Sequence, residues 1–134
     1  MSFIGTTIND SPTIACIAGE KLENKEFTAV AFNEDKLIAN VTAGANVIGI
    51  LIAEDDCIDK GNTVTVQIKD IGMWKVGEAV EAGDELTSND KGLAVKATDG
   101  SFITAIALEG AGEANAVIRV QIIKAGYKPA AAKA

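Results

Sequence analysis

The stretch TVTVQI at residues 63–68 decides the fold, together with AVIRVQI at residues 116–122. In both, β-branched residues alternate with polar ones, which is the period of a strand with one buried and one exposed face. Similar runs separated by turns rich in Asn, Asp and Gly recur at residues 27–32, 37–41, 47–52, 93–97 and 102–108. Short strands with a turn about every ten residues predict an all-β domain, either a small sandwich or a barrel.

The strands also repeat as a block. Three landmarks recur at nearly constant offsets of 56, 55 and 54 residues: 33–37 in 89–93, 48–54 in 103–109, and Val66-Gln67-Ile68 in Val120-Gln121-Ile122. This predicts two similar β units; the alternative is that any two β meanders with Asn-Asp turns look alike. Because a few strands rarely fold alone, we expect two such units to share one core.

Composition excludes much of the common chemistry of proteins. The 134 residues carry a net charge of -7, with no histidine and two cysteines, and Arg119 is the single arginine. Without histidine there is no Ser-His-Asp triad and no imidazole ligand, and two cysteines do not build a structural zinc site. A phosphate backbone calls for clustered basic residues. We therefore expect no enzyme, no metal, no cofactor and no nucleic-acid partner.

Both ends of the chain differ from its middle. Pro12 and Pro129 are the two prolines, and the last residues are small, cationic and low in complexity. We expect an extended N-terminal arm at residues 1–15, a β domain at 16–125 and a flexible tail at 126–134. The first residues do not resemble a signal peptide, and the longest apolar run, 47–53, is far shorter than the roughly 20 residues of a membrane helix. We expect synthesis in the cytoplasm and no membrane partner.

One dense acidic cluster, Glu54-Asp55-Asp56 with Asp59, is a candidate cation site. Carboxylates at this spacing are hard oxygen ligands of the kind that calcium prefers. The cluster lacks the glycine and the terminal glutamate of an EF-hand loop, and Cys57 interrupts it. A solvated loop is the better interpretation.

Trp74 is the sole tryptophan, and Met73 and Val76 flank it. A side chain of this size either fills a core or anchors an interface between subunits, where tryptophan is often a binding hot spot. We expect Trp74 and Met73 at or near a subunit interface.

The order of the segments resembles that of the capsid decoration, or head cement, proteins of tailed bacteriophages. The resemblance covers about residues 19–123 and rests on VIGILIA at 47–53, VTVQI at 64–68, VEAGDELTS at 80–88, ITAIALE at 103–109 and AVIRVQI. It implies a structural virion protein, made in the host cytoplasm, that binds the outside of an assembled capsid. Such proteins are commonly homotrimers that clamp neighbouring copies of the major capsid protein.

Under this resemblance the N-terminal arm is the candidate capsid contact. Its residues Ser2, Phe3, Ile4, Thr6, Thr7 and Ile8 would add a strand to the edge of a capsid sheet. A different class is a carbohydrate- or cell-surface-binding β module of a phage or adhesin, which needs exposed aromatics or calcium ligands. A hydrolase using Glu54 or Asp55 is the third class.

Overall fold

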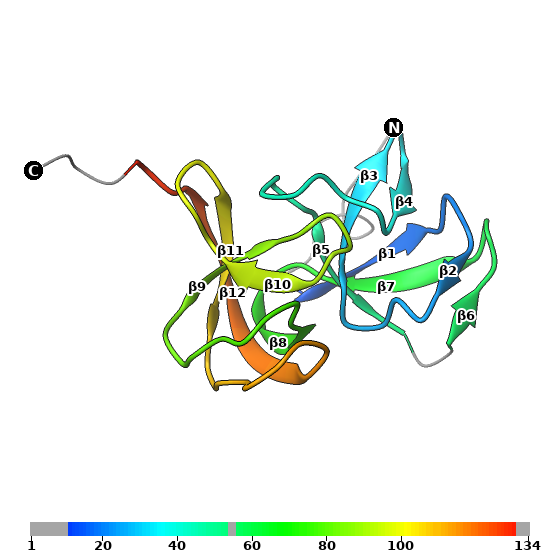
Figure 1. The fold of residues 1–134 in the computed structure, drawn as a ribbon. Helices are drawn as coiled ribbons and strands as arrows, with labels where there is room; N and C mark the ends of the chain where they lie inside the picture. The colour runs from blue at the N-terminus through cyan, green and yellow to red at the C-terminus, as the bar shows by residue number, and fades with distance from the viewer. Residues whose placement is uncertain (1–10, 54–55, 131–134) are drawn as a thin grey trace, which may run out of the picture.

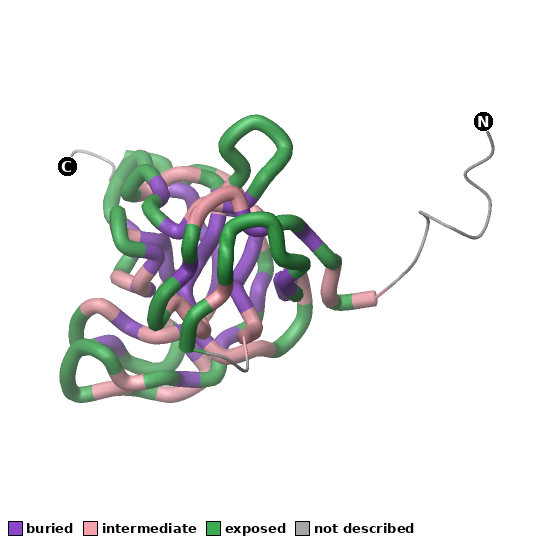
Figure 2. Tube along the Cα trace, turned by 90° about the vertical axis from the view of Figure 1, so that its right-hand side faces the viewer, coloured by how far each residue is buried: buried purple, intermediate pink, exposed green. Residues whose placement is uncertain are grey.

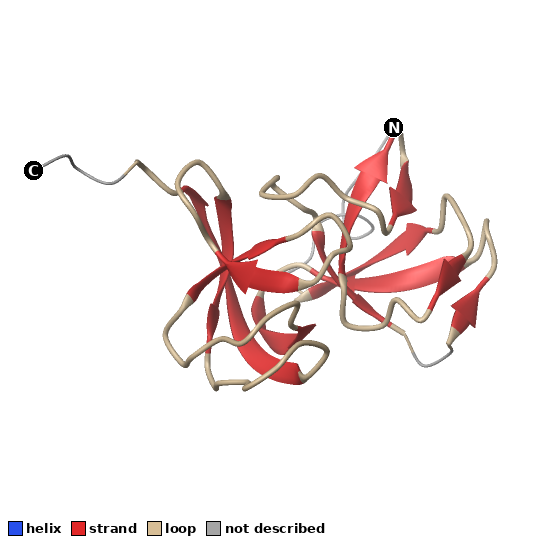
Figure 3. Cartoon of the chain, in the orientation of Figure 1, coloured by secondary structure: helices blue, strands red, loops and turns tan. Residues whose placement is uncertain are grey.

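The computed structural model describes residues 11–53 and 56–130. In this part of the chain every regular element is a strand and no helix occurs, so the all-β prediction is confirmed (Figures 1 and 3). The strands are β1 (Thr13–Ile17), β2 (Leu22–Glu23), β3 (Ala29–Asn33), β4 (Lys36–Ile38), β5 (Gly49–Ile52), β6 (Cys57–Ile58), β7 (Thr63–Gln67), β8 (Asp70–Lys75), β9 (Glu85–Ser88), β10 (Ala94–Lys96), β11 (Phe102–Ala107) and β12 (Val117–Tyr127).

Two five-stranded antiparallel sheets have the same topology. The first has the order β1-β7-β5-β3-β4, and the second, counted from β8, has the order β8-β12-β11-β9-β10. Each sheet curls until its edge strands meet at one parallel bridge, Ala18 with Leu37 and Val76 with Ala94, and neither is a closed barrel. We call residues 13–68 the first unit and residues 70–127 the second unit. The units lie side by side, and β2 with β6 forms a short ribbon on the first (Figure 1).

The two units repeat one another down to single hydrogen bonds. The amide of Phe27 donates to the carbonyl of Leu51, and the amide of Gly83 donates to the carbonyl of Ala107, both at 2.8 Å. Both donors have a positive φ, 60° at Phe27 and 91° at Gly83. We call residues that occupy the same place in the two units equivalent, so Leu51 is equivalent to Ala107.

Cross-strand pairs give the same alignment. One row crosses β3, β5 and β7 at Ala29, Ile50 and Gln67, and the same row crosses β9, β11 and β12 at Glu85, Ile106 and Gln121. The alignment confirms that Val66-Gln67-Ile68 recurs as Val120-Gln121-Ile122. It corrects the repeat expected between residues 48–54 and 103–109: residues 48–53 align with 104–109, one residue later than their sequence similarity suggested.

A dipeptide that sequence reasoning missed, Gly-Glu at residues 19–20 and 77–78, ties the two edge strands of each sheet together. Gly19 donates to the Leu37 carbonyl at 2.7 Å, and Glu20 Oε1 accepts the Ala39 amide at 2.8 Å. In the second unit, Gly77 donates to Ala94 at 2.8 Å and Glu78 Oε1 accepts from Lys96 at 2.9 Å. Glycine suits this place because a Cβ on residue 19 would lie 2.9 Å from the Leu37 oxygen.

Each unit buries its own core inside its curled sheet, and exposed turns surround the buried strands (Figure 2). Eight equivalent positions supply both cores: Cys16, Ala18, Leu22, Val30, Leu37, Leu51, Val64 and Val66 in the first, and Trp74, Val76, Val80, Leu86, Ala94, Ala107, Ile118 and Val120 in the second.

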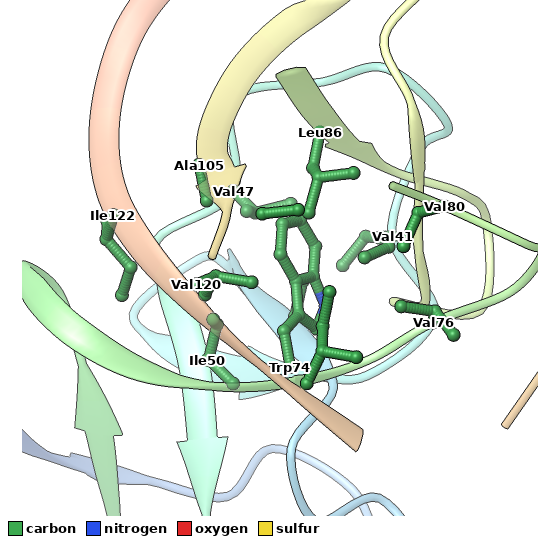
Figure 4. Packing of buried hydrophobic residues seen from close by; sticks show 14 residues of the cluster. Val41, Val47, Ile50, Trp74, Val76, Val80, Leu86, Ala105, Val120 and Ile122 are labelled. Atoms are coloured by element: carbon green, nitrogen blue, oxygen red, sulfur yellow. The ribbon is translucent and has the colours of Figure 1, made fainter. Parts of the chain in front are cut away.

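Trp74 belongs to the second core, which the first unit helps to fill. The indole is fully buried, and its Nε1 donates to the Gly92 carbonyl at 2.8 Å. Val41, Val47 and Ile50 of the first unit pack into the same cluster (Figure 4). Of the two alternatives for Trp74, core or subunit anchor, the structure therefore shows the core, and no surface of the indole is left for a second subunit.

The boundaries expected for the arm and the tail need correction. Thr13–Ala15, assigned to the arm, belong to β1 and pair with β7. Gly126 and Tyr127, assigned to the tail, belong to β12 and pair with β11 at Ile103 and Phe102. β1 and β12 extend beyond the expected limits of the β domain. The positions of Pro12 and Pro129 near the two ends had suggested narrower limits. The remaining arm residues, up to residue 10, and residues 131–134 lie outside the described part of the chain.

Replacing Trp74 with alanine should lower the free energy of unfolding by about 3–5 kcal/mol, because the change empties a core position occupied by a large aromatic ring. Urea unfolding followed by far-UV circular dichroism measures the loss. The matched control is Met73→Ala on the same strand, where the side chain is only half-buried. Equal losses in the two variants would contradict the central place given to Trp74.

Candidate interaction surfaces

The described residues contain neither a cluster of metal ligands nor a helix that could span a membrane. Across residues 11–53 and 56–130, no group of three or more His, Cys, Asp or Glu side chains is placed to hold a metal ion. Asp56 and Asp59 of the acidic cluster fall in this range, whereas Glu54 and Asp55 lie outside it. A search of the same residues found no helix long and apolar enough to span a bilayer.

The two cysteines are free thiols in different environments. Cys16 is buried in the first core, and burial raises the pKa of its thiol because the thiolate loses its hydration. Cys57 is exposed and lines a shallow hollow of about 310 Å³ beside Ile58 and Val64. The two thiols should therefore differ in reactivity.

The junction between the units is the best-defined interaction surface. Four backbone hydrogen bonds of 2.8–2.9 Å cross it: Lys75 N to Phe27 O, Ala29 N to Gly92 O, Gly44 N to Ser88 O, and Phe102 N to Gly44 O. Beneath them, Ala29 and Ile50 on the outside of the first sheet are completely covered by the second unit. The junction thus combines a paired backbone with apolar burial.

The Gln67 side chain completes the junction at the link between the units. Its Nε2 donates to the carbonyls of Lys69 and Ile71, at 3.0 and 2.8 Å. Ile71 lies on β8, the edge strand of the second sheet, so the amide satisfies backbone acceptors that an edge strand otherwise presents. It also fixes the direction in which β8 leaves the first unit.

The outer face of the second sheet is uncovered and partly apolar. The row of Glu85, Ile106 and Gln121 continues across β8 to Ile71, which is 62% exposed. Along β12 the same face presents Val117, Arg119 and Ile123. We call this surface the outer face. Its ion pairs, Arg119 with Glu109 at 3.7 Å and Lys128 with Glu85 at 3.2 Å, are solvent-exposed and contribute little stability.

The first unit exposes two large apolar side chains at its opposite side. Ile17 at the end of β1 is 47% exposed, and Phe32 at the end of β3 is 44% exposed. Phe32 leads into a tight turn in which Glu34 has a positive φ of 59°. Single exposed apolar residues are common on proteins, so their meaning depends on how they correspond to the rest of the fold.

Of the site residues expected from the sequence, only Met73 is found at a described surface. Neighbouring residues on a strand point to opposite faces, so Trp74 points into the core while Met73 points to the outer face. Ser2, Phe3, Ile4, Thr6, Thr7 and Ile8 lie outside the described residues. Sequence reasoning missed the outer face, although the alternation in residues 116–123 places Val117 and Ile123 on the side opposite the core.

At pH 8, a thiol reagent such as DTNB should modify Cys57 rapidly and Cys16 slowly, because the thiolate is the nucleophile and Cys16 titrates at higher pH and is buried. Absorbance of the released thiolate should show one fast-reacting thiol in the native protein and two in guanidinium chloride. The control variant Cys57→Ser should lose the fast phase. A fast phase that persists in this variant would contradict the burial of Cys16.

Comparisons with known proteins bear on the fold. No family model and no curated protein sequence matches the chain. A solved structure, the N base of the head fiber protein gp8.5 of bacteriophage phi29, aligns with a TM-score of 0.62 at 19% sequence identity. The alignment covers 87% of this chain and 97% of the gp8.5 chain. The chain therefore shares its fold, over nearly its whole length, with a protein of a phage head.

Proposed function

We propose that the chain is a structural protein of a tailed-phage virion, a decoration protein that binds the outside of the assembled capsid and stabilises it. The observation that carries this proposal is the fold similarity to the base of a phage head fiber, which extends over nearly all of both chains. The sequence resemblance to head cement proteins also supports this class. A non-enzymatic role also suits a chain without histidine.

The proposed partner is the major capsid protein, and the proposed assembly on the capsid exterior is a homotrimer. A capsid offers many closely spaced copies of one site, so an oligomer gains avidity from contacts that are weak one at a time. A protein that binds only the assembled lattice stabilises that lattice by mass action. The net charge of -7 keeps such a protein soluble in the host cytoplasm until capsids form.

The test uses capsids assembled from the major capsid protein of the same genome. The full chain should co-sediment with expanded capsids, and it should bind unexpanded ones weakly because the lattice site is not yet formed. Bound capsids should also resist heat or denaturant better than bare ones. Absence of co-sedimentation, together with binding on a glycan array with or without calcium, would instead support a carbohydrate-binding module.

Deleting residues 2–10 should abolish capsid binding, because it removes the segment proposed to add a strand to a capsid sheet. The deletion stops before β1, since Thr13–Ile17 pair with β7 and are needed for the fold. Circular dichroism should be unchanged, and co-sedimentation with expanded capsids measures the effect.

The matched control for this deletion removes residues 131–134 from the other end of the chain, and it should bind as the full chain does. Binding that survives loss of residues 2–10 would contradict the role of the arm. It would leave the proposal of a decoration protein intact.

A further inference from the structure

The second unit covers one surface of the first unit. The equivalent surface of the second unit has no such cover in the described part of the chain. In the junction, Ala29 and Ile50 are buried beneath the second unit. Their equivalents, Glu85 and Ile106 on the outer face, are only half-buried. The second unit thus keeps the surface on which a further unit would sit, but no described residue of the chain occupies it around Ile106.

The second unit covers the first with a surface of its own. The equivalent surface of the first unit covers nothing within the described chain. Lys75 and Ser88 make junction hydrogen bonds to the first unit. Their equivalents are Ile17, which takes the place of Lys75 beside the parallel bridge, and Phe32, which takes the place of Ser88 opposite β4. These are the two large apolar residues that the first unit exposes, at 47% and 44%.

The uncovered surface of the second unit is hollowed. A depression of about 550 Å³ lies over it, lined by Gly83, Asp84, Glu85, Lys96, Ala97, Ile106 and Lys128. Gly83 is equivalent to Phe27, whose carbonyl accepts the Lys75 amide in the junction. The hollow therefore presents, at the matching place, a backbone acceptor beside Ile106 and Ala97, with the charged side chains of Asp84, Glu85, Lys96 and Lys128 around them.

We infer that this chain binds a second copy of itself head to tail, repeating its own internal junction. Ile17 and Phe32 of one copy lie over the surface around Ile106 and Glu85 of the next, as their equivalents Lys75 and Ser88 lie at the junction that covers Ile50 and Ala29 within one chain. The Ile17 amide then faces the Gly83 carbonyl of the next copy. A second copy is the fitting occupant because the chain carries both halves of an interface that it already forms once internally.

We call the surface around Ile17 and Phe32 the donor surface, and the surface around Ile106 and Glu85 that it would cover the acceptor surface. The C-terminal end of β12 covers one margin of the acceptor surface. Gly44 of the first unit bonds to Ser88 and Phe102 across the junction, whereas its equivalent, Gly100, donates to the Lys128 carbonyl at 2.8 Å. Lys128 also donates to Glu85 Oε1 at 3.2 Å. Because the hydrogen-bonding groups at this margin already have partners within the chain, the second copy binds the part of the surface around Ile106.

Such an interface is heterologous, since two different surfaces meet. Heterologous contacts form a ring when the rotation between copies closes, and an open chain when it does not. A closed homotrimer would then hold six similar units around one axis. The inference rests on the homotrimer proposed above and adds the two surfaces that would form it. A chain that binds capsids but stays monomeric in solution would contradict this inference and leave the proposed capsid binding intact.

The experiment measures self-association of the full chain by sedimentation velocity over a range of concentrations. Phe32→Glu removes the donor surface and Ile106→Glu removes the acceptor surface, and each should weaken association at least about tenfold because a charge would be buried in the interface. The control is Val117→Glu. Val117 is 37% exposed on the same outer face, but its equivalent, Thr63, is exposed in the first unit and lies outside the junction.

Mixing the two defective variants gives the sharpest test. Phe32→Glu keeps an intact acceptor and Ile106→Glu keeps an intact donor, so the mixture should form a 1:1 dimer that neither variant forms alone. A two-fold, face-to-face interface would give no such rescue. A wild-type chain that stays monomeric, or a Phe32→Glu variant that associates like wild type, would overturn the inference. A variant with an altered circular dichroism spectrum is replaced by Phe32→Ala or Ile106→Ala, with the same expected direction.

Discussion

The fold depends on the burial of the first unit's outer surface in the core of the second. A curled sheet of five short strands leaves one end of its interior open, and Val41, Val47 and Ile50 close the end of the second unit around Trp74. Burying apolar surface is the main favourable term in folding, and a few isolated strands are marginal in water. The two units are therefore halves of one domain, and the junction determines the position of every other surface.

The structure separates what stabilises this protein from what it presents to partners. Its cores are formed at equivalent positions in both units, mostly by aliphatic residues, whereas other equivalent positions differ: Phe32 is 44% exposed, and its equivalent Ser88 is buried. The charged side chains of the outer face, such as Arg119 and Glu109, form only exposed pairs. A repeated scaffold with unlike outer surfaces is compatible with the proposed role of a structural protein that binds several partners.

Much of the fold follows from local patterns. The alternation in residues 63–68 and 116–122 predicts strands because it depends only on neighbouring side chains, and the repeat of Val66-Gln67-Ile68 predicts two units. The pairing of β1 with β7 and of β8 with β12 joins residues far apart in sequence, so periodicity does not reveal the curl of the sheets. Trp74 shows the same limit. Its size predicts either a core position or an interface anchor, and the residues of the first unit that pack against it, such as Val47 and Ile50, are brought there only by tertiary packing.

The strand order also has a consequence for synthesis on the ribosome. In each unit the first strand pairs with the last, so β1 stays without its neighbour until β7 has been translated, and β8 waits for β12. Such long-range pairing slows folding. After the first unit has formed, Ala29 and Ile50 stay bare until the second unit emerges. During that interval a neighbouring nascent chain can compete for them, which makes translation speed over the last strands a determinant of yield.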